Sequence, residues 1–313
     1  PKSVMKEAQS VPHEISEQLG GKRVDFRNLL TVTIDGEDAR DLDDAITLSK
    51  KDEKYYLGVH IADVAHYVKE DSPLDKEAVE RATSVYLADR VIPMLPRELS
   101  NGICSLNAGT DRLAMSCMMT FDVNGNVLDH TITESVICVD ERMSYTGVKA
   151  ILEGQEHPEG EREDIRALCF LMKEAAAILK EKRRKRGAID FDFPESKIIV
   201  DDKGYPIDIH PYERNVATDI IEDFMLLANE TVAEDYFWQE IPFLYRTHEI
   251  PDSDKIKKLD TFIHNFGYYM KTGRENFHPK EIQKLLFSLE GEPEEPLISR
   301  LALRSMKQAK YTM

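Results

Sequence analysis

Residues 33–45 read Thr-Ile-Asp-Gly-Glu-Asp-Ala-Arg-Asp-Leu-Asp-Asp-Ala and place six carboxylates in ten positions. Four of them, Asp35, Asp41, Asp43 and Asp44, cannot all stay ionised a few ångströms apart unless a cation neutralises them; otherwise some of their pKa values must rise. Carboxylate oxygens are hard ligands, so the segment favours Mg²⁺ or Mn²⁺ over zinc. Clustered carboxylates that hold such ions are a common apparatus for hydrolysing phosphodiesters.

Two simpler interpretations compete with a metal site. Most acidic loops are solvated turns, but this one lies between strand-like apolar runs at 30–34 and 45–48, which would bury its ends. A calcium loop of the EF-hand type requires a different spacing of acidic residues and glycine, with a glutamate further on. The segment does not fit that spacing. A Mg²⁺ or Mn²⁺ site for phosphodiester hydrolysis is therefore the better expectation.

The flanking sequence predicts strands early in the chain and helices later. Apolar strand patterns occur in 24–68, and a hairpin is expected where 113–123 and 127–139 flank Asn124-Gly125-Asn126. A helix is predicted for 73–83, where Ala78, Val79 and Ala82 recur at helical spacing, and another from 164 to a stop at Gly187. Further elements are expected at 198–209 (a hairpin), 216–237, 254–268, 279–289 and 296–310 (helices). This order without βαβ alternation predicts an α+β fold.

Composition excludes several classes of protein. The chain has 313 residues, of which 42% are hydrophobic, enough for a large globular core. No apolar run approaches the ~18–20 residues of a membrane span. The four cysteines show no metal-binding spacing and suit a reducing compartment, so we expect a cytoplasmic protein with no membrane partner. The chain starts at Pro1, which suggests a fragment, and residues 1–22 look like a lead-in segment.

The acidic segment and several later motifs together resemble the RNB catalytic domain of the ribonuclease II/ribonuclease R family. The likeness covers roughly residues 20–313, and Gly36–Arg40 within the acidic segment is closest to the ribonuclease R version. The other motifs follow in the family's order: Val59–Val64, Thr83–Tyr86, Val91–Pro96, Leu99–Asn101, Cys104–Leu106, Asp111-Arg112 and Leu303–Ala309.

The resemblance implies an RNB-type α+β catalytic domain over 23–313 and a set of site residues. Asp35, Asp41, Asp43 and Asp44 would be the metal and catalytic residues, with Asp43 closest to the chemical step. Mg²⁺ would be the cofactor, and Mn²⁺ could substitute for it. RNA-binding residues would be Tyr86, Tyr145, Glu222, Arg300, Arg304 and Lys307, of which the last three share one helical face at i, i+4 and i+7.

Each of these residues also has a structural interpretation. A lone tyrosine usually belongs to a core or its rim, and Glu222 lies on the acidic face of the predicted 216–237 helix with Asp219, Asp223 and Glu230. Arg40 either neutralises a carboxylate or contacts a phosphate. The basic run at 180–186 suits a helix C-terminus, although it could also guide RNA. The net charge of −17 argues against an RNA partner only superficially, because a substrate can enter a local channel.

The sequence and the resemblance together predict a Mg²⁺-dependent hydrolytic 3′→5′ exoribonuclease that releases nucleoside 5′-monophosphates from the 3′ end of single-stranded RNA. The family also carries OB-fold RNA-binding domains on both sides of this domain, and an arginine-bearing segment after the match to Leu303–Ala309. Neither occurs in this chain, so the domain is expected to be incomplete at its C-terminus. Two alternatives stay open: another metal-dependent phosphoesterase, or a non-catalytic RNA-binding scaffold.

Overall fold

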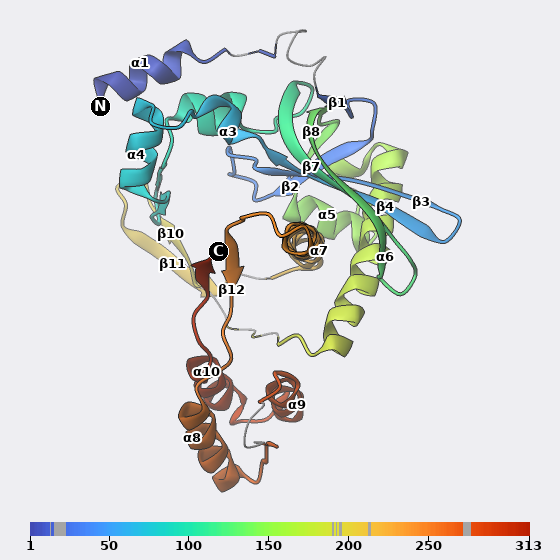
Figure 1. Ribbon diagram of the computed structural model, residues 1–313, viewed down its shortest axis with the longest axis vertical. Helices are drawn as coiled ribbons and strands as arrows, with labels where there is room; N and C mark the ends of the chain where they lie inside the picture. Colours follow the sequence, from blue (N-terminus) through green and yellow to red (C-terminus); the bar gives the residue numbers. More distant parts are fainter. Residues whose placement is uncertain are drawn as a thin grey trace. The chain divides into compact units, whose positions relative to one another are not determined.

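The computed structural model describes residues 1–12, 14–15, 23–189, 191, 193, 196–211, 214–271 and 277–313. Two compact units divide the chain, the first formed by 1–179 and 196–232 and the second by 180–195 and 233–313. Each unit is described by itself. The elements, shown in Figure 1, are α1 (Lys2–Ser10), β1 (Val24–Asp25), β2 (Thr31–Asp35), β3 (Asp44–Lys51), β4 (Lys54–Ala62), α3 (Val64–Tyr67), α4 (Pro73–Arg81), β5 (Val85–Tyr86), β6 (Val91–Ile92), η1 (Glu98–Ile103), β7 (Asp111–Phe121), β8 (Val127–Cys138), β9 (Glu141–Ser144), α5 (Tyr145–Leu152), η2 (Pro158–Gly160), α6 (Glu163–Arg186), β10 (Ser196–Val200), β11 (Pro206–Pro211), α7 (Val216–Trp238), β12 (Tyr245–Thr247), α8 (Ser253–Ile263), η3 (His264–Phe266), α9 (Lys280–Leu289), α10 (Glu295–Ser305) and β13 (Lys310–Thr312).

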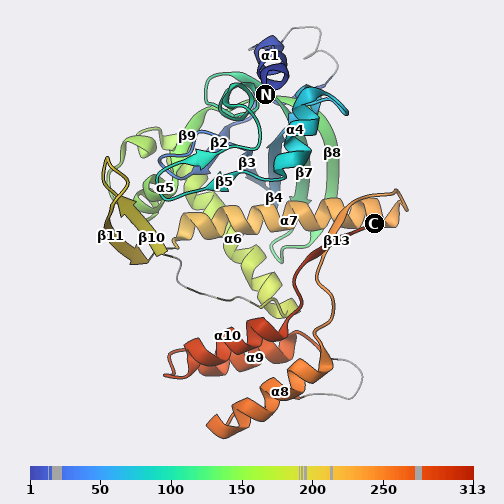
Figure 2. The same ribbon diagram turned by 90° about the vertical axis from the view of Figure 1, so that its left-hand side faces the viewer.

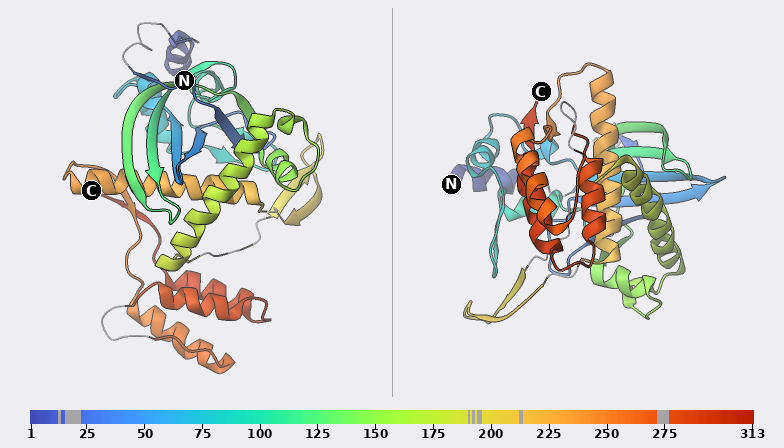
Figure 3. Two further views of the ribbon diagram at one scale, coloured as in Figure 1. Left: turned by 90° about the vertical axis from the view of Figure 1, so that its right-hand side faces the viewer. Right: turned by 90° about the horizontal axis from the view of Figure 1, so that it is seen from below.

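A seven-stranded mixed sheet dominates the first unit. Its strand order is β1-β8-β7-β4-β3-β2-β9, antiparallel in the middle and parallel at the two outer pairs, β1–β8 and β2–β9. The predicted hairpin is confirmed as β7 and β8, which are long and strongly curved (Figure 3). Its turn suits the sequence, since Gly125 has a positive φ of 77° and the Asp122 carboxylate accepts the backbone N–H groups of Asn124 and Asn126. The predicted α+β class is confirmed.

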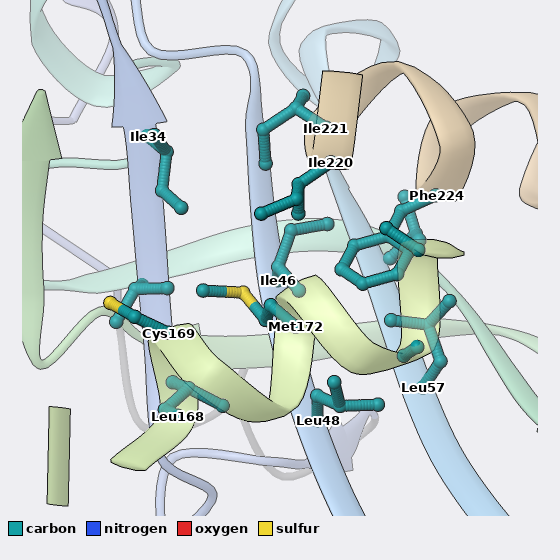
Figure 4. Packing of buried hydrophobic residues seen from close by; sticks show 14 of the residues in the cluster. Ile34, Ile46, Leu48, Leu57, Leu168, Cys169, Met172, Ile220, Ile221 and Phe224 are labelled. Atoms are coloured by element: carbon teal, nitrogen blue, oxygen red, sulfur yellow. The ribbon is translucent and has the colours of Figure 1, made fainter. Parts of the chain in front are cut away.

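Helices α5, α6 and α7 cover one face of this sheet. Ile34, Ile46 and Leu57 project from the strands against Met172 of α6 and Phe224 of α7 (Figure 4), and all five side chains are at most 2% exposed. Figure 2 shows α6 and α7 crossing in that view. Burying a side chain of this size contributes about 1.5–3 kcal/mol, so the cluster fixes the strands that carry the acidic segment.

Helix α6 ends where the sequence predicts. Gly187 follows it with a φ of 108°, a conformation that favours glycine. The last carbonyls are satisfied from α9, because the Gln283 amide donates to the carbonyls of Arg184 and Ala188, each at 2.8 Å. Within the basic run, Arg184 and Lys185 also pair with Glu181 on the same helix. The helix-terminus interpretation of the basic run therefore accounts for these two cations.

The second unit contains a helical cluster built from α8, α9 and α10. Ile263, Ile282 and Ile298 are fully buried at its centre. The predicted 296–310 helix is wrong at its end, because α10 stops at Ser305 and Lys310–Thr312 pair with β12 instead. Strand β12 offers free backbone groups there, and the guanidinium of Arg246 lies over the Tyr311 ring at 5.3 Å.

Two predicted helix faces also need correction. In α4 the buried residue is Leu74, whereas Val79 is 73% exposed. Leu74 packs against Val4 and Ala8 of α1, so the predicted lead-in segment contains a helix that covers α4; its Gly20 and Gly21 lie outside the described residues. In α7, Asp223 was expected on the exposed acidic face but is only 2% exposed. Among the described helices, none is long and apolar enough to span a membrane.

Candidate active site

The aspartates gather at a fork between two strands. β2 and β3 are paired at Thr31–Thr47 and Val32–Ile46, and on its other edge β2 pairs with β9 from Val32–Glu141 to Asp35–Ser144. Asp35 ends β2 on one side of the fork, while Asp44 begins β3 on the other, directly after Asp43. Residues 36–43 connect the two sides. The strand–loop–strand arrangement predicted around the acidic segment is confirmed.

Backbone hydrogen bonds hold the loop from one side through Ser105. Leu42, which is 1% exposed, donates its N–H to the Ser105 hydroxyl at 3.0 Å and accepts the N–H of Leu106 at 2.9 Å. The Ser105 hydroxyl in turn donates to the carbonyl of Arg40 at 2.9 Å. The buried Arg112 fixes Ser105, because its Nε donates to the Ser105 carbonyl at 2.8 Å. Leu42 thus anchors the loop between Asp41 and Asp43.

From the other side, Arg142 of β9 holds the same loop. Its Nη2 donates to the carbonyls of Glu37 at 3.0 Å and Ala39 at 2.6 Å. Its positive charge also lowers the pKa of Asp35, against the larger effect of burial. The side chain of Arg40 is exposed and forms no ion pair in the described part of the chain, so it does not neutralise a carboxylate there. The cation that organises the acidic loop is therefore Arg142.

The pKa values show that the carboxylates share one environment. Burial raises the pKa of Asp35, Asp43 and Asp44, and that of Asp44 reaches about 6. Mutual repulsion adds to burial in each case, from Asp41 on Asp35, from Asp41 and Asp35 on Asp43, and from Asp35 and Asp43 on Asp44. The Asp43 side chain is exposed to solvent, yet enough protein surrounds its carboxyl to disfavour ionisation. A cation bound among these groups would reverse all three shifts.

The site fits a hard divalent cation that keeps part of its hydration shell. Asp44 Oδ2 is buried and has no hydrogen-bond partner among the described residues, which is costly for an ionised oxygen unless a cation or water binds it. Over the same residues, no three His, Cys, Asp or Glu side chains form a ready-made metal cage. Mg²⁺ commonly binds through one or two carboxylates together with waters and substrate phosphates, so a cage of protein ligands is not required.

Tyr86 lies next to the aspartates. Its hydroxyl donates to Asp41 Oδ2 at 3.4 Å, from the short strand β5 that pairs with β6. The residue is 69% exposed, so it is not the core residue of the alternative interpretation. An exposed ring fixed at one edge beside a carboxylate site can stack on a base.

Tyr145 and Glu222 belong to the same unit but occupy different surroundings. Tyr145 opens α5 after its N-cap Ser144, and its ring packs against the core cluster. Glu222 lies on α7 and forms an ion pair of 2.5 Å with Arg214, which also binds Asp219 at 2.6 Å. Their RNA-binding roles stay predictions.

Arg300, Arg304 and Lys307 lie in the second unit. The first two are exposed on α10, one helical turn apart, as predicted. Lys307 follows the end of the helix and pairs with Glu249 at 3.2 Å, so it does not share their helical face. The guanidinium of Arg300 lies 6.0 Å from the Phe193 ring centre.

Sequence reasoning missed Arg142, and also the aromatic pair Phe191 and Phe193. These two rings are stacked, with centres 5.8 Å apart and planes at 10°. An aromatic residue at every second position after the α6 stop was the available signal. The sequence contains no signal for Arg142, because the role of this residue depends on the parallel pairing of β9 with β2.

The curved mixed sheet carries an acidic fork with an exposed aromatic ring beside it, an arrangement that suits the binding of a hard divalent cation. The chain belongs to the RNB domain family, whose sequence profile matches residues 23–313. The predicted family is confirmed.

Three similar proteins agree with this membership. The chain is 46% identical over its full length to Ribonuclease R 1 of Lactococcus lactis and 46% identical to Ribonuclease R of Thermotoga maritima, of which it spans 38% and 44%. A structure of Mycoplasma genitalium RNase R in complex with ribose methylated single-stranded RNA superimposes on all of the chain. That comparison has a TM-score of 0.95 and 30% identity, and covers 49% of the other chain. The chain thus spans less than half the length of these relatives.

Proposed function

We propose that this chain carries the hydrolytic centre of a divalent-metal-dependent 3′→5′ exoribonuclease that releases nucleoside 5′-monophosphates. The observation that supports this most directly is the acidic fork, where Asp35, Asp43 and Asp44 have raised pKa values. Asp44 Oδ2 is also buried there without a hydrogen-bond partner among the residues that the structure describes. Membership in the RNB domain family and the likeness to proteins named ribonuclease R support the same class of reaction.

Mg²⁺ is the proposed cofactor, and Mn²⁺ a substitute. Asp35, Asp43 and Asp44 would hold it, since they lie on the two sides of the fork and repel one another without it. A bound divalent ion supplies charge neutralisation and a water made acidic enough to attack phosphorus near neutral pH. Asp41, which accepts the Tyr86 hydroxyl, would keep the aromatic ring beside the scissile phosphate. Arg142 would hold the loop in place through its two carbonyl contacts.

The proposed substrate is the 3′ end of single-stranded RNA. A ring that stacks on bases holds any sequence, because every base has a π-face, and Tyr86 offers such a ring. Glu222 could accept from a ribose 2′-hydroxyl if RNA displaces its partner Arg214, which would distinguish RNA from DNA. The structure of the Mycoplasma genitalium relative in complex with single-stranded RNA supports this substrate class.

The test is a trimming assay on single-stranded RNA labelled at its 5′ end, with Mg²⁺, Mn²⁺ or EDTA. We expect a ladder that shortens from the 3′ end, nucleoside 5′-monophosphates by chromatography, and no cleavage in EDTA. Asp43→Asn should abolish trimming while RNA binding persists, because the loss of a catalytic interaction of this kind costs several kcal/mol of barrier. Asp38→Asn is the matched control, since this exposed carboxylate lies in the same loop.

The outcomes distinguish the alternatives. Internal cleavage, or release of inorganic phosphate alone, would indicate another metal-dependent phosphoesterase. Metal-independent RNA binding without any turnover would indicate a scaffold. Near-normal trimming by Asp43→Asn would show that the aspartates of the fork are not the hydrolytic site.

A further inference from the structure

A chain of five buried polar side chains crosses the sheet, one from each of five adjacent strands. Thr31 Oγ1 (β2) lies 2.9 Å from Thr47 Oγ1 (β3), which lies 3.0 Å from His60 Nε2 (β4). His60 Nδ1 lies 2.6 Å from Ser116 Oγ (β7), which lies 2.6 Å from Ser135 Oγ (β8). All five residues are at most 8% exposed. We call this set the hydroxyl–imidazole chain.

The hydroxyl–imidazole chain uses all its donors. Each hydroxyl has one proton, and a neutral imidazole donates from one nitrogen and accepts at the other. If Thr31 donates to the Leu29 carbonyl at 2.9 Å, then Thr47 donates to Thr31 and His60 Nε2–H donates to Thr47. In the same direction, Ser116 donates to His60 Nδ1 and Ser135 donates to Ser116. The Ser135 hydroxyl also lies 3.2 Å from the Ala114 carbonyl, so two acceptors compete for its single proton. Removal of the Thr47 hydroxyl would leave the buried His60 Nε2–H without its partner.

One end of the hydroxyl–imidazole chain lies where β2 and β3 are paired, at the base of the fork. Thr31 and Thr47 form one of the two residue pairs that join β2 to β3, and Val32–Ile46 is the other. By contrast, β3 and β4 are paired from Asp44–Ile61 to Lys51–Lys54, along their whole length. Two residues further along the same face of β2, the Thr33 hydroxyl is buried and has no partner among the described residues. The side-chain network thus stops where the strands begin to separate.

Beyond this base the strands carry like charges. Asp35 lies at the end of β2, Asp44 begins β3 and Asp43 directly precedes it, so like charges stand on the two sides of the fork. Backbone pairing between β2 and β3 ends at Val32–Ile46, short of these charges. The side-chain bond from Thr31 to Thr47, continued through His60 into β4 and β7, joins the fork to the rigid middle of the sheet.

We infer that the hydroxyl–imidazole chain positions the acidic fork, with Thr47 as the positioning residue that sets the distance of Asp35 from Asp43 and Asp44. The inference rests on the proposed metal site and adds the side chains that shape it from outside. Thr47 touches no substrate or metal itself. It acts through β2 and β3, because it bonds both Thr31 and His60.

The test compares Thr47→Val with Ser135→Ala. Valine keeps the shape of threonine without its hydroxyl, at the fork end of the chain. Ser135→Ala removes a buried hydroxyl from the same network at its far end, in β8. Both variants should lose stability. Only Thr47→Val should weaken Mn²⁺ binding, by about 10-fold in Kd by isothermal titration calorimetry without RNA, as is common when a residue that orients metal ligands is lost. Thr47→Ser, which keeps the hydroxyl, should restore the affinity.

The inference would be overturned if Thr47→Val bound Mn²⁺ as tightly as the wild type, or if Ser135→Ala weakened Mn²⁺ binding equally. The hydroxyl–imidazole chain would then only stabilise the fold. If Thr47→Val does not fold, Thr31→Val removes only the terminal link and takes its place. Failure of the proposed function is a separate result: the wild type would bind Mn²⁺ but leave RNA untrimmed. Absence of Mn²⁺ binding by the wild type would overturn the inference, because the fork would have no metal to accommodate.

Discussion

At the scale of single residues, Tyr86 combines two groups that can be separated. Its ring is exposed for stacking, while its hydroxyl contacts Asp41. Tyr86→Ala should lengthen the shortest RNA left at the end of digestion but spare the rate on long RNA, because long substrates keep their other contacts. The loss is one stacked base, about 1–3 kcal/mol. The lengths of limit products on a sequencing gel give the measurement.

Tyr86→Phe is the control for this experiment. It keeps the ring and removes only the bond to Asp41, so the limit product should stay as short as in the wild type. A limit product unchanged in Tyr86→Ala would return the tyrosine to a structural role.

Asp44 Oδ2 is buried and has no hydrogen-bond partner within the described ranges of the chain, which predicts opposite effects with and without metal. Asn has the same shape and no charge, so Asp44→Asn should raise the melting temperature in EDTA by a few degrees, from about 2 kcal/mol of relieved burial cost. Mn²⁺ should stabilise the wild type but have little effect on the variant. Thermal melts at several Mn²⁺ concentrations measure both effects. A variant less stable than the wild type in EDTA would contradict the prediction.

At the scale of elements, β4 carries a histidine whose protonation opposes folding. Burial lowers the pKa of His60 to about 4, below the usual 6.5 of an unfolded chain. Between these values the unfolded state binds a proton that the folded state does not. The contribution of neutral His60 to the free energy of unfolding is therefore complete above pH 6.5. It is lost as the pH falls toward 4, by at most about 1.4 kcal/mol per pH unit.

Urea unfolding at pH 7.5, 6 and 5 tests this titration. Since other groups titrate in the same range, the difference between the wild type and His60→Gln isolates the histidine. The wild type should lose more stability than the variant on acidification, although it starts more stable. Ser116→Ala keeps the imidazole and should keep the wild-type pH dependence. Parallel curves for the wild type and His60→Gln would show that His60 is protonated equally in both states.

Some helices and strands follow from local sequence patterns alone, and others depend on distant segments of the chain. Local signals sufficed for the β7–β8 hairpin, with its Asn-Gly-Asn turn, and for α6, with its stop at Gly187. They failed where distant chain segments decide. Residues 306–310 continue the helical pattern of α10, but the helix ends at Ser305 and Lys310–Thr312 pair with β12. Leu74 rather than Val79 is buried because α1 covers that side of α4. The aspartates were identifiable from their density, whereas the pairing of β2 with β9, which brings Arg142 to them, was not.

At the scale of the whole molecule, a net charge of −17 must be reconciled with a polyanionic substrate. If RNA is held mainly by stacking and by a few cations, binding should depend only weakly on salt. Three phosphate contacts, from Arg300, Arg304 and Lys307, would give a slope of log K against log [salt] of about −2 for a single strand. Arg304→Gln should make this slope less steep by about 0.7.

Fluorescence anisotropy with a labelled RNA between 50 and roughly 300 mM KCl, a range wide enough to resolve such a slope, gives the measurement. Lys257→Gln removes an exposed cation of α8 that has no proposed contact with RNA, and should leave the slope unchanged. A slope far steeper than that expected for three contacts would point to a basic surface that the present assignment omits.

The acidic loop is held almost wholly through main-chain groups, namely the N–H and carbonyl of Leu42 and the carbonyls of Glu37, Ala39 and Arg40. Every residue other than proline carries the same backbone N–H and carbonyl groups, whatever its side chain. The outward positions 38 and 40 can therefore change without moving the aspartates, whereas the Glu37 carboxylate accepts a hydrogen bond from Thr146. A family built on this loop can vary those two positions while the proposed metal-binding aspartates stay in register.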